Sequence, residues 1–275
     1  KLAGQIGITP FLDLAIALSA VLSSIHARRV IHKDLNPSNI VLNPETGVVK
    51  VIDFGISASQ LEEESIAFEP PSLLQGTPFY LSPEQTGRIS RSLDYRTDFY
   101  SLGCTFYQLL TGRLPFASED ILELVYCHLA RTPQSPRALR PEIPDSLAAI
   151  VLKLMAKNPD DRYQSAHGLL VDLSLCQRQL REGEPPRAAF ELGRQDIASR
   201  FHLPARLYGR DAEIARLLTA FERTRQAHTG LMLVTGYSGI GKSAVVRELY
   251  APITGPHCWR FLPEKTFHTK SAPDP

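Results

Sequence analysis

Two short polar motifs separated by apolar residues constrain this chain more than any other feature. The first reads His-Lys-Asp-Leu-Asn-Pro-Ser-Asn at 32–39, and the second reads Asp-Phe-Gly at 53–55. Between them, 40–42 and 48–52 are rich in Ile and Val, and the residues that join these runs, Asn-Pro-Glu-Thr-Gly, are typical of a turn. The pattern predicts a β-hairpin with one polar motif leading into it and the other following it.

Both motifs carry the residue types that phosphoryl transfer to a hydroxyl requires. Such a reaction needs a carboxylate that orients the hydroxyl and accepts its proton, together with oxygen ligands for Mg²⁺. Asp34 and Asn39 fit these roles, and Asp53 supplies a second carboxylate for the metal. Gly55 allows the chain to turn sharply after it. Taken alone, an Asp-Phe-Gly triplet also occurs by chance, and a lone His32 is more often a core residue.

A third motif, Ser-Pro-Glu at 82–84, follows along the chain. In this order and spacing, the three motifs resemble the catalytic loop, the metal-binding triplet and the APE-type motif of eukaryotic-like protein kinases. The resemblance covers about residues 1–181 and implies the mainly α-helical C-lobe of the protein kinase fold, which is an α+β fold. It also implies that residues 56–81 form the activation segment.

The resemblance implies roles for individual residues in the reaction. Asp34 would be the catalytic base, and Asn39 and Asp53 would be ligands of Mg²⁺, with ATP as the phosphoryl donor. Thr77 lies where Ser/Thr-specific kinases carry a threonine beside the substrate hydroxyl. This position favours protein substrates that present Ser or Thr over those that present Tyr.

Other residues would support this site from a distance. His32 begins the catalytic-loop motif, and Asp98 resembles the buried carboxylate that anchors this loop from the next long helix. Glu84 and Arg162 would form an internal ion pair that ties the activation segment to the later helices. The resemblance therefore implies a structural role for each of these residues.

Two substitutions depart from the kinase pattern. Lys33 replaces the usual Arg, so pairing with a phosphorylated activation loop would be weaker. Asn36 stands where Ser/Thr kinases usually place a Lys near the transferred phosphate, which removes a positive charge from the transition state. No glycine-rich loop, strand Lys or partner Glu precedes His32. We therefore expect a fragment that lacks the N-lobe. Two alternatives to an active kinase stay open: an ATP-binding pseudokinase scaffold, or a truncated gene product without activity.

Apolar periodicity predicts the remaining elements of this region. Residues 9–27 are apolar around nearly the whole helix circumference, so we expect a buried central helix. The polar, acidic and proline-containing residues 57–75 indicate a long exposed loop. Residues 182–205 lose the periodicity and are interpreted as a linker. Further helices are expected at 98–111, 118–130, 145–157 and 165–181.

A second phosphate-binding pattern lies near the end of the sequence. Residues 236–243 match G-x-x-x-x-G-K-S between an expected strand at 231–234 and an expected helix from Lys242. In such a loop backbone amides surround the phosphates, Lys242 contacts their oxygens and Ser243 is a ligand of Mg²⁺. The alternative is a glycine-rich turn between strand and helix that binds no ligand. The glycines of the pattern are Gly236, Gly239 and Gly241.

The segment before this pattern, at 207–213, reads Leu-Tyr-Gly-Arg-Asp-Ala-Glu and leads into an amphipathic helix expected at 211–227. It resembles the opening of AAA-type ATPases, so we expect 206–275 to be the N-terminal part of an α/β P-loop NTPase domain. A kinase C-lobe followed by such a segment resembles bacterial hybrid proteins that join a Ser/Thr kinase, an AAA-type ATPase, a GAF sensor and a histidine kinase. The resemblance implies a role in signal transduction, with sensor and histidine kinase modules downstream as partners.

Composition narrows the classes of partner and the cellular locations that remain open. Thirty Lys and Arg residues against 29 Asp and Glu residues leave a net charge of +1, which gives no electrostatic reason to expect nucleic acid or an anionic membrane as a partner. No uninterrupted apolar run reaches the length of a membrane helix, and no signal peptide is expected. Four widely spaced cysteines are typical of a reduced, cytoplasmic protein. They are Cys104, Cys127, Cys176 and Cys258.

Overall fold

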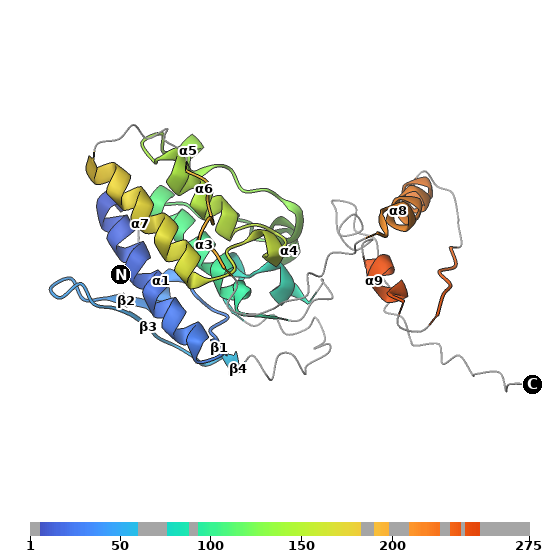
Figure 1. Ribbon diagram of the computed structural model, residues 1–275, viewed down its shortest axis with the longest axis horizontal. Helices are drawn as coiled ribbons and strands as arrows, with labels where there is room; N and C mark the ends of the chain where they lie inside the picture. Colours follow the sequence, from blue (N-terminus) through green and yellow to red (C-terminus); the bar gives the residue numbers. More distant parts are fainter. Residues whose placement is uncertain are drawn as a thin grey trace, which may run out of the picture.

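The computed structural model describes residues 6–59, 76–87, 93–182, 190–197, 209–225, 232–237 and 240–247. Residues 6–182, called the helical unit below, contain most of the described helices and two small sheets (Figure 1). Two further helices, α8 (Asp211–Arg225) and α9 (Lys242–Arg247), belong to the later part of the chain. The predicted loop at 57–75 lies outside the described residues from residue 60 onward, as does Cys258.

Long helices form the body of the helical unit, and α1 and α7 lie side by side along one side of it (Figure 1). Apolar periodicity predicted each long helix, with ends that differ from the structure by a few residues. The helices of the unit are α1 (Ile8–Ala27), α3 (Arg96–Thr111), α4 (Ile121–Ala130), α5 (Pro136–Leu139), α6 (Asp145–Leu154) and α7 (Ala166–Glu182). Helix α3 ends at Gly112, whose φ of 72° suits a residue without a side chain.

Helix α1 is less buried than its composition predicts. Phe11, Leu18 and Leu22 lie in the core, whereas Asp13 and Ser23 face the solvent, so the helix is buried along one side only. Within the described residues, α1 is long and apolar enough to cross a membrane by length and composition alone, although Asp13 and its serines interrupt the apolar run. Its buried side chains pack against those of the other helices, as in the core helix of a folded domain.

The predicted hairpin is present. Strands β2 (Ile40–Leu42) and β3 (Val49–Val51) pair antiparallel, with Val41 opposite Lys50. Because side chains alternate along a strand, Ile40 and Val49 pack into the core beside α1, while the opposite face is solvent-exposed. That outer face carries Val41, Val48 and Ile52, which are 46%, 49% and 44% exposed.

A second pair of strands has no counterpart in the sequence analysis. Strand β1 (Val30–Ile31) pairs antiparallel with β4 (Ala58–Ser59), with Val30 opposite Ser59 and Ile31 opposite Ala58. Each strand has only two residues, which is too short for a recognisable alternation of apolar and polar side chains. This pairing holds the chain after the Asp-Phe-Gly motif against the chain before the first polar motif.

The later part of the chain differs from its prediction at one element. Residues 232–234 were expected in a strand, but no strand includes them among the described residues, and Leu233 is 81% exposed. A strand is stable only when its backbone groups pair with a neighbour, and the described residues provide no such neighbour here. The helices expected on either side, α8 and α9, are both present.

The cysteines that the structure describes are free thiols, as their spacing predicted. Cys104, Cys127 and Cys176 are buried among apolar side chains. Burial raises the pKa of Cys104 to about 12 and that of Cys176 to about 11. The thiols of Cys104 and Cys176 are therefore protonated near neutral pH, and all three cysteines are core residues.

Candidate active site

One buried carboxylate on α3 organises the first polar motif. Asp98 has no exposed surface, and its Oδ2 and Oδ1 accept hydrogen bonds from the backbone amides of His32 (3.0 Å) and Lys33 (2.8 Å). The Nε2 atom of His26 lies 2.9 Å from Oδ2 of the same carboxylate. Because Lys33 has a φ of 69°, the backbone bends at this point, and the two amide bonds stabilise the bend. Asp98 thus fixes the loop that begins at His32.

The ring of His32 connects the two polar motifs. Its Nε2 atom donates to the carbonyl of Ile52 (3.1 Å), since a carbonyl oxygen can only accept. The ring is therefore a neutral tautomer whose Nδ1 accepts from the backbone amide of Asp34 (3.3 Å). The edge-to-face contact between His32 and Phe54 has a centroid distance of 4.7 Å. His32 therefore joins the catalytic-loop motif to the Asp-Phe-Gly motif by two contacts.

The carboxylate of Asp34 is held by neutral donors on both sides. Its Oδ1 accepts from the backbone amide of Thr77 (2.9 Å), and its Oδ2 accepts from Nδ2 of Asn39 (3.1 Å). The same Nδ2 also donates to the backbone carbonyl of Asp34 at 2.9 Å. Asp34 is half-buried, so its carboxylate is held in one orientation but stays accessible to solvent. Such a group can orient a hydroxyl and accept its proton.

Asn36 occupies the position of the missing lysine, and its contacts were not predicted from the sequence. Its Nδ2 donates to Oγ1 of Thr77 (3.1 Å) and to the carbonyl of Asp34 (3.2 Å). Its Oδ1 accepts from the amide of Ser38 (2.9 Å) and so caps the short helix η1 (Pro37–Asn39). Asn36 thus brings no positive charge to this position and instead forms a hydrogen bond between the catalytic-loop motif and Thr77.

Asn39 and Asp53 are brought close along the backbone of the hairpin. The amide of Ile52 donates to the carbonyl of Asn39 (2.9 Å), which places Asp53 one residue beyond that bond. Asp53 has a φ of 63°, is exposed, and accepts a hydrogen bond of 3.3 Å from the amide of Gly55. No group of three or more His, Cys, Asp or Glu side chains suited to a metal occurs among the described residues. One amide and one carboxylate oxygen remain as candidate ligands, and both are hard donors that suit Mg²⁺.

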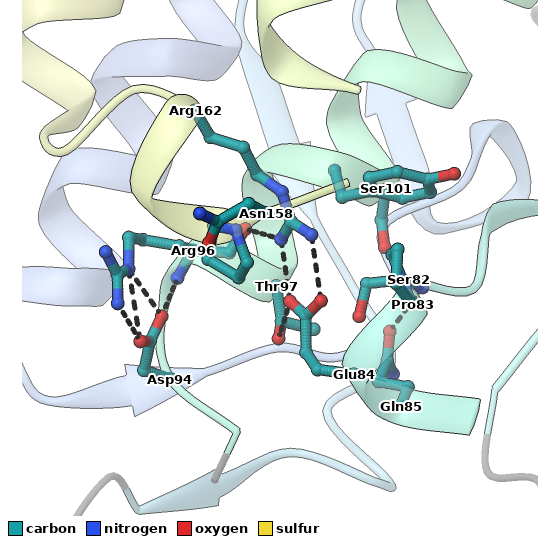
Figure 2. A network of polar contacts seen from close by, with 12 residues as sticks. Ser82, Pro83, Glu84, Gln85, Asp94, Arg96, Thr97, Ser101, Asn158 and Arg162 are labelled. Carbon is teal, nitrogen blue, oxygen red and sulfur yellow. Dashed lines mark hydrogen bonds and ion pairs between the residues drawn. The ribbon is translucent and has the colours of Figure 1, made fainter. Parts of the chain in front are cut away.

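Glu84 and Arg162 form the buried ion pair that the resemblance implied. Nη1 and Nη2 of Arg162 lie 2.6 and 2.8 Å from the two carboxylate oxygens, and Oγ1 of Thr97 donates to Oε1 at 2.8 Å (Figure 2). Burial alone would raise the pKa of Glu84, but the charge and hydrogen bonds of Arg162 outweigh it, so this pKa lies below 4.5. Figure 2 shows the guanidinium and the carboxylate facing each other.

Gln85 links this ion pair to the first polar motif, and the sequence analysis did not identify it. Its Nε2 donates to the carbonyl of Lys33 (2.8 Å), and its Oε1 accepts from the amide of Ser82 (3.0 Å). Gly76, with a φ of 107°, packs near the same carbonyl of Lys33. The glutamine and glycine together hold the chain at 76–87 against the catalytic-loop motif.

The second phosphate-binding pattern is described in part. The Nζ atom of Lys242 donates to the carbonyls of Gly236 and Tyr237, both at 2.8 Å, so its ammonium group lies inside the turn. Gly236 and Gly241 have φ values of 156° and 91°. Ser243 lies in α9, although its side chain is not described, and Gly239 lies outside the described residues.

Comparison with known proteins identifies both parts of the chain. The protein kinase domain family matches residues 11–172, and the AAA ATPase domain family matches residues 206–273. The chain belongs to the protein kinase family. Its kinase domain is followed by an AAA ATPase region, as the motifs implied.

Several known proteins are similar to this chain. The hybrid signal transduction histidine kinase G of Dictyostelium discoideum is 31% identical over 333 residues, which covers 90% of this chain and 10% of that protein. A probable serine/threonine-protein kinase of Streptomyces coelicolor is 37% identical, over 66% of this chain and 26% of that protein. The serine/threonine-protein kinase PknB of Mycobacterium tuberculosis is 39% identical, over 59% of this chain and 25% of that protein. The chain thus spans about a quarter or less of the length of these relatives.

Proposed function

We propose that this chain carries the C-lobe of an ATP-dependent protein serine/threonine kinase, within a larger signalling protein of bacterial type. The observation that carries the proposal is the oriented carboxylate of Asp34, held by the amide of Thr77 and the side chain of Asn39. Membership of the protein kinase family supports this assignment. The printed names of its relatives, serine/threonine-protein kinases and a hybrid histidine kinase, agree with it.

Asp34 is proposed as the catalytic base. Its carboxylate orients the hydroxyl of a protein Ser or Thr and accepts the proton as the oxygen attacks phosphorus. The two neutral donors keep the carboxylate in one orientation. Thr77, bonded through its hydroxyl to Asn36, lies beside this carboxylate and is proposed to contact the substrate segment. This contact would favour Ser and Thr over the longer Tyr side chain.

Asn39 and Asp53 are proposed as the ligands of Mg²⁺. The amide nitrogen of Asn39 is committed to Asp34, which leaves its amide oxygen for a metal. The carboxylate of Asp53 is exposed and accepts one long hydrogen bond within its own turn. These two oxygen donors suit Mg²⁺. When bound, Mg²⁺-ATP supplies the phosphoryl group, and the metal ion neutralises charge on the phosphates.

The outer face of the hairpin supports the assignment of the helical unit as a C-lobe. Val41, Val48 and Ile52 leave an exposed apolar surface next to Asp53, and Phe54 is 43% exposed beside it. Exposed apolar groups that gather at one place indicate a surface that is covered by another part of a protein. We propose that the smaller kinase lobe covers this face in the parent protein and completes the ATP site.

The AAA ATPase region is proposed to bind a second nucleotide. Lys242, Gly236 and Gly241 would surround its phosphates, with Gly239 and Ser243 completing the loop and the Mg²⁺ site. The lysine ammonium, which contacts two loop carbonyls, is the group that would exchange these bonds for phosphate oxygens. We further propose a cytoplasmic protein whose downstream sensor and histidine kinase modules act together with the kinase domain.

The decisive test measures transfer of γ-labelled phosphate from Mg²⁺-ATP to a basic protein substrate. It compares the chain, the chain extended upstream in its reading frame, and the extended protein with Asp34→Asn. Asp13→Asn, at an exposed position of α1, is the matched control for the loss of one carboxylate. We expect label transfer by the extended protein and its Asp13→Asn control, with at least a hundredfold loss in Asp34→Asn. Equal transfer by Asp34→Asn would refute the role of Asp34.

Asn36 favours a second candidate function, an ATP-binding pseudokinase scaffold. Its side chain is engaged with Thr77 and brings no cation toward a transferred phosphate. A scaffold would bind ATP without transferring phosphate, even in the extended protein. Nucleotide binding that is lost in Lys242→Ala, without label transfer by any form, would support this candidate over the first.

A further inference from the structure

Residues 190–197 lie between the two regions that the families match, within the predicted linker, yet they contact the helical unit. The kinase match ends at residue 172 and the AAA ATPase match begins at residue 206. Within this segment Phe190 and Leu192 are half-buried and pack against the core of the helical unit. The opposite side of the segment is exposed, with Glu191, Arg194 and Ile197 facing solvent. The segment therefore has an inner and an outer face.

Asp196 attaches the end of this segment to the start of α7. Its Oδ2 accepts from the backbone amide of Gln164 (2.7 Å), and its Oδ1 accepts from Oγ of Ser165 (2.8 Å). Ser165 in turn accepts from the amide of Gly168 (2.9 Å), so the carboxylate extends the capping of the helix. A negative charge is also favoured at this end of a helix. Both oxygens of Asp196 thus have a specific partner.

Asp172 provides a second attachment, from inside the helical unit. This carboxylate is buried, and its Oδ2 accepts from the hydroxyl of Tyr163 (2.6 Å) and from the backbone amide of Gly193 (2.8 Å). Without the segment, this oxygen would lose one of its two donors. Gly193 has a φ of 75°, and this bend brings its amide toward Asp172. A turn closes the segment, because the amide of Asp196 donates to the carbonyl of Gly193 (3.0 Å).

Gly168 is the position at which the segment comes closest to α7. A Cβ atom placed on Gly168 would lie 2.4 Å from Oδ1, 2.5 Å from Cβ and 2.7 Å from Cα of Asp196. Two of these atoms are fixed by the backbone of the segment, so rotation of a side chain cannot relieve the overlap. The docked segment, and not the helix itself, therefore requires a glycine at position 168.

Through Gln164, the hydrogen bonds of Asp196 also connect to the ion-paired residues Arg96 and Arg162. Gln164, which donates its backbone amide to Asp196, accepts from Nη1 of Arg96 (2.8 Å) and donates to the carbonyl of Arg162 (2.8 Å). Arg162 is the partner of Glu84. The segment thus supports the loop that carries the buried arginine.

We propose that residues 190–197 are a docking segment that binds the surface formed by residues 163–172 through Asp196 and Asp172. The structural unit of the kinase domain then extends to Ile197, and the chain toward the AAA ATPase region starts from this surface. The occupant of the surface is this segment of the same chain, which makes three hydrogen bonds to the surface and packs its apolar side against the core.

Hydrogen exchange in the whole chain tests the docking directly. The amides of Gly193 and Gln164 donate to the two aspartates, so both should exchange at least a hundredfold slower than in an unstructured peptide. Asp196→Ala should accelerate both by at least tenfold, because the carboxylate that joins the segment to α7 is removed. Glu191→Ala removes the same charge from the outer face of the segment and should change the exchange rates of these two amides less than twofold. Unprotected exchange at Gly193 in the wild type, or equal effects of both variants, would overturn the proposal.

Gly168→Ala provides a second test that does not depend on removal of a charge. Alanine at a helical glycine ordinarily raises thermal stability, because it favours the helix. Here we expect a lower melting temperature and faster exchange at Gly193, since the new methyl group displaces Asp196. His167→Ala, at the exposed neighbouring position, should leave both unchanged. A higher melting temperature for Gly168→Ala, with exchange at Gly193 unaltered, would show that the segment is not docked.

Discussion

Replacement of Glu84 by Gln tests the energetic role of the buried ion pair. The substitution keeps the size of the side chain but removes the negative charge opposite Arg162, whose side chain has no exposed surface. One of the two carboxylate oxygens also becomes an NH₂ group, which faces a donor nitrogen of the guanidinium at close range. The variant therefore leaves a buried positive charge without its counter-ion.

The size of the effect follows from the burial of both partners. Loss of one partner from a buried ion pair costs about 3–5 kcal/mol, because the remaining charge stays desolvated. A domain of this size loses about 2–4 °C in melting temperature per kcal/mol, so we expect a decrease of roughly 10 °C. The effect should depend on pH. Since the folded-state pKa of Glu84 is lowered, its stabilising contribution is present above pH 4.5 and is lost as the pH falls through the folded-state value.

Urea unfolding followed by circular dichroism at pH 7 and pH 4 measures this prediction. The matched control is Glu142→Gln, because Glu142 pairs with Arg140 at 2.6 Å but its side chain is 63% exposed. Exposed pairs contribute about 0–1 kcal/mol, so this control should remain close to the wild type. If Glu84→Gln is destabilised no more than Glu142→Gln at pH 7, the argument from burial is refuted.

Three further predictions concern the helical unit. Gly103→Ala should destabilise it by about 1–3 kcal/mol, measured by thermal unfolding, because the new Cβ would lie 2.8 Å from Leu154 and from Met155; an increase in stability would contradict the packing. Burial, with a contribution from a nearby lysine, lowers the pKa of His128 to about 4, so stability should fall as the pH decreases from 6.5 to 4, and His128→Leu should reduce this slope in urea titrations. Asp98→Asn should abolish label transfer by the extended protein while its circular dichroism spectrum stays helical, and full activity would exclude the anchoring role.

The helices and the hairpin were predictable because their signals are local. Apolar residues at helical spacing indicated each long helix, and the turn residues between two β-branched runs indicated the hairpin. The two-residue strands β1 and β4 gave no such signal, because their pairing depends on residues almost thirty positions apart. The exposed side of α1 was also missed, since composition does not show which neighbours cover a helix.

The candidate site was predictable as a set of residues but not as a set of contacts. The motifs identified Asp34, Asn39 and Asp53, and the ion pair of Glu84 followed from the family resemblance. The hydrogen bond between Asn36 and Thr77 was not foreseen, because the sequence shows only that a lysine is missing. A side chain that replaces a charge by a hydrogen bond can be identified only when both partners are placed in space.

The interpretation of residues 182–205 as a linker rested on the loss of periodicity, which reports helices and strands only. A segment that docks through two carboxylates and two partly buried apolar side chains leaves no periodic signal. Asp196 and Gly168 are 28 positions apart, and nothing in either local sequence relates them. Contacts of this kind explain why predicted linkers require a structure before they are treated as free chain.

The docking segment changes how far the AAA ATPase region can move from the kinase domain. From Glu182 to Asp211 a chain extended at about 3.5 Å per residue could span about 100 Å, whereas from Ile197 to Asp211 it could span about 50 Å. The effective concentration of each region at the other falls roughly as the −3/2 power of the length of the connecting chain, so halving this length raises it about threefold. Release of the whole docking segment would therefore weaken any contact between the two regions about threefold without altering a residue of that contact.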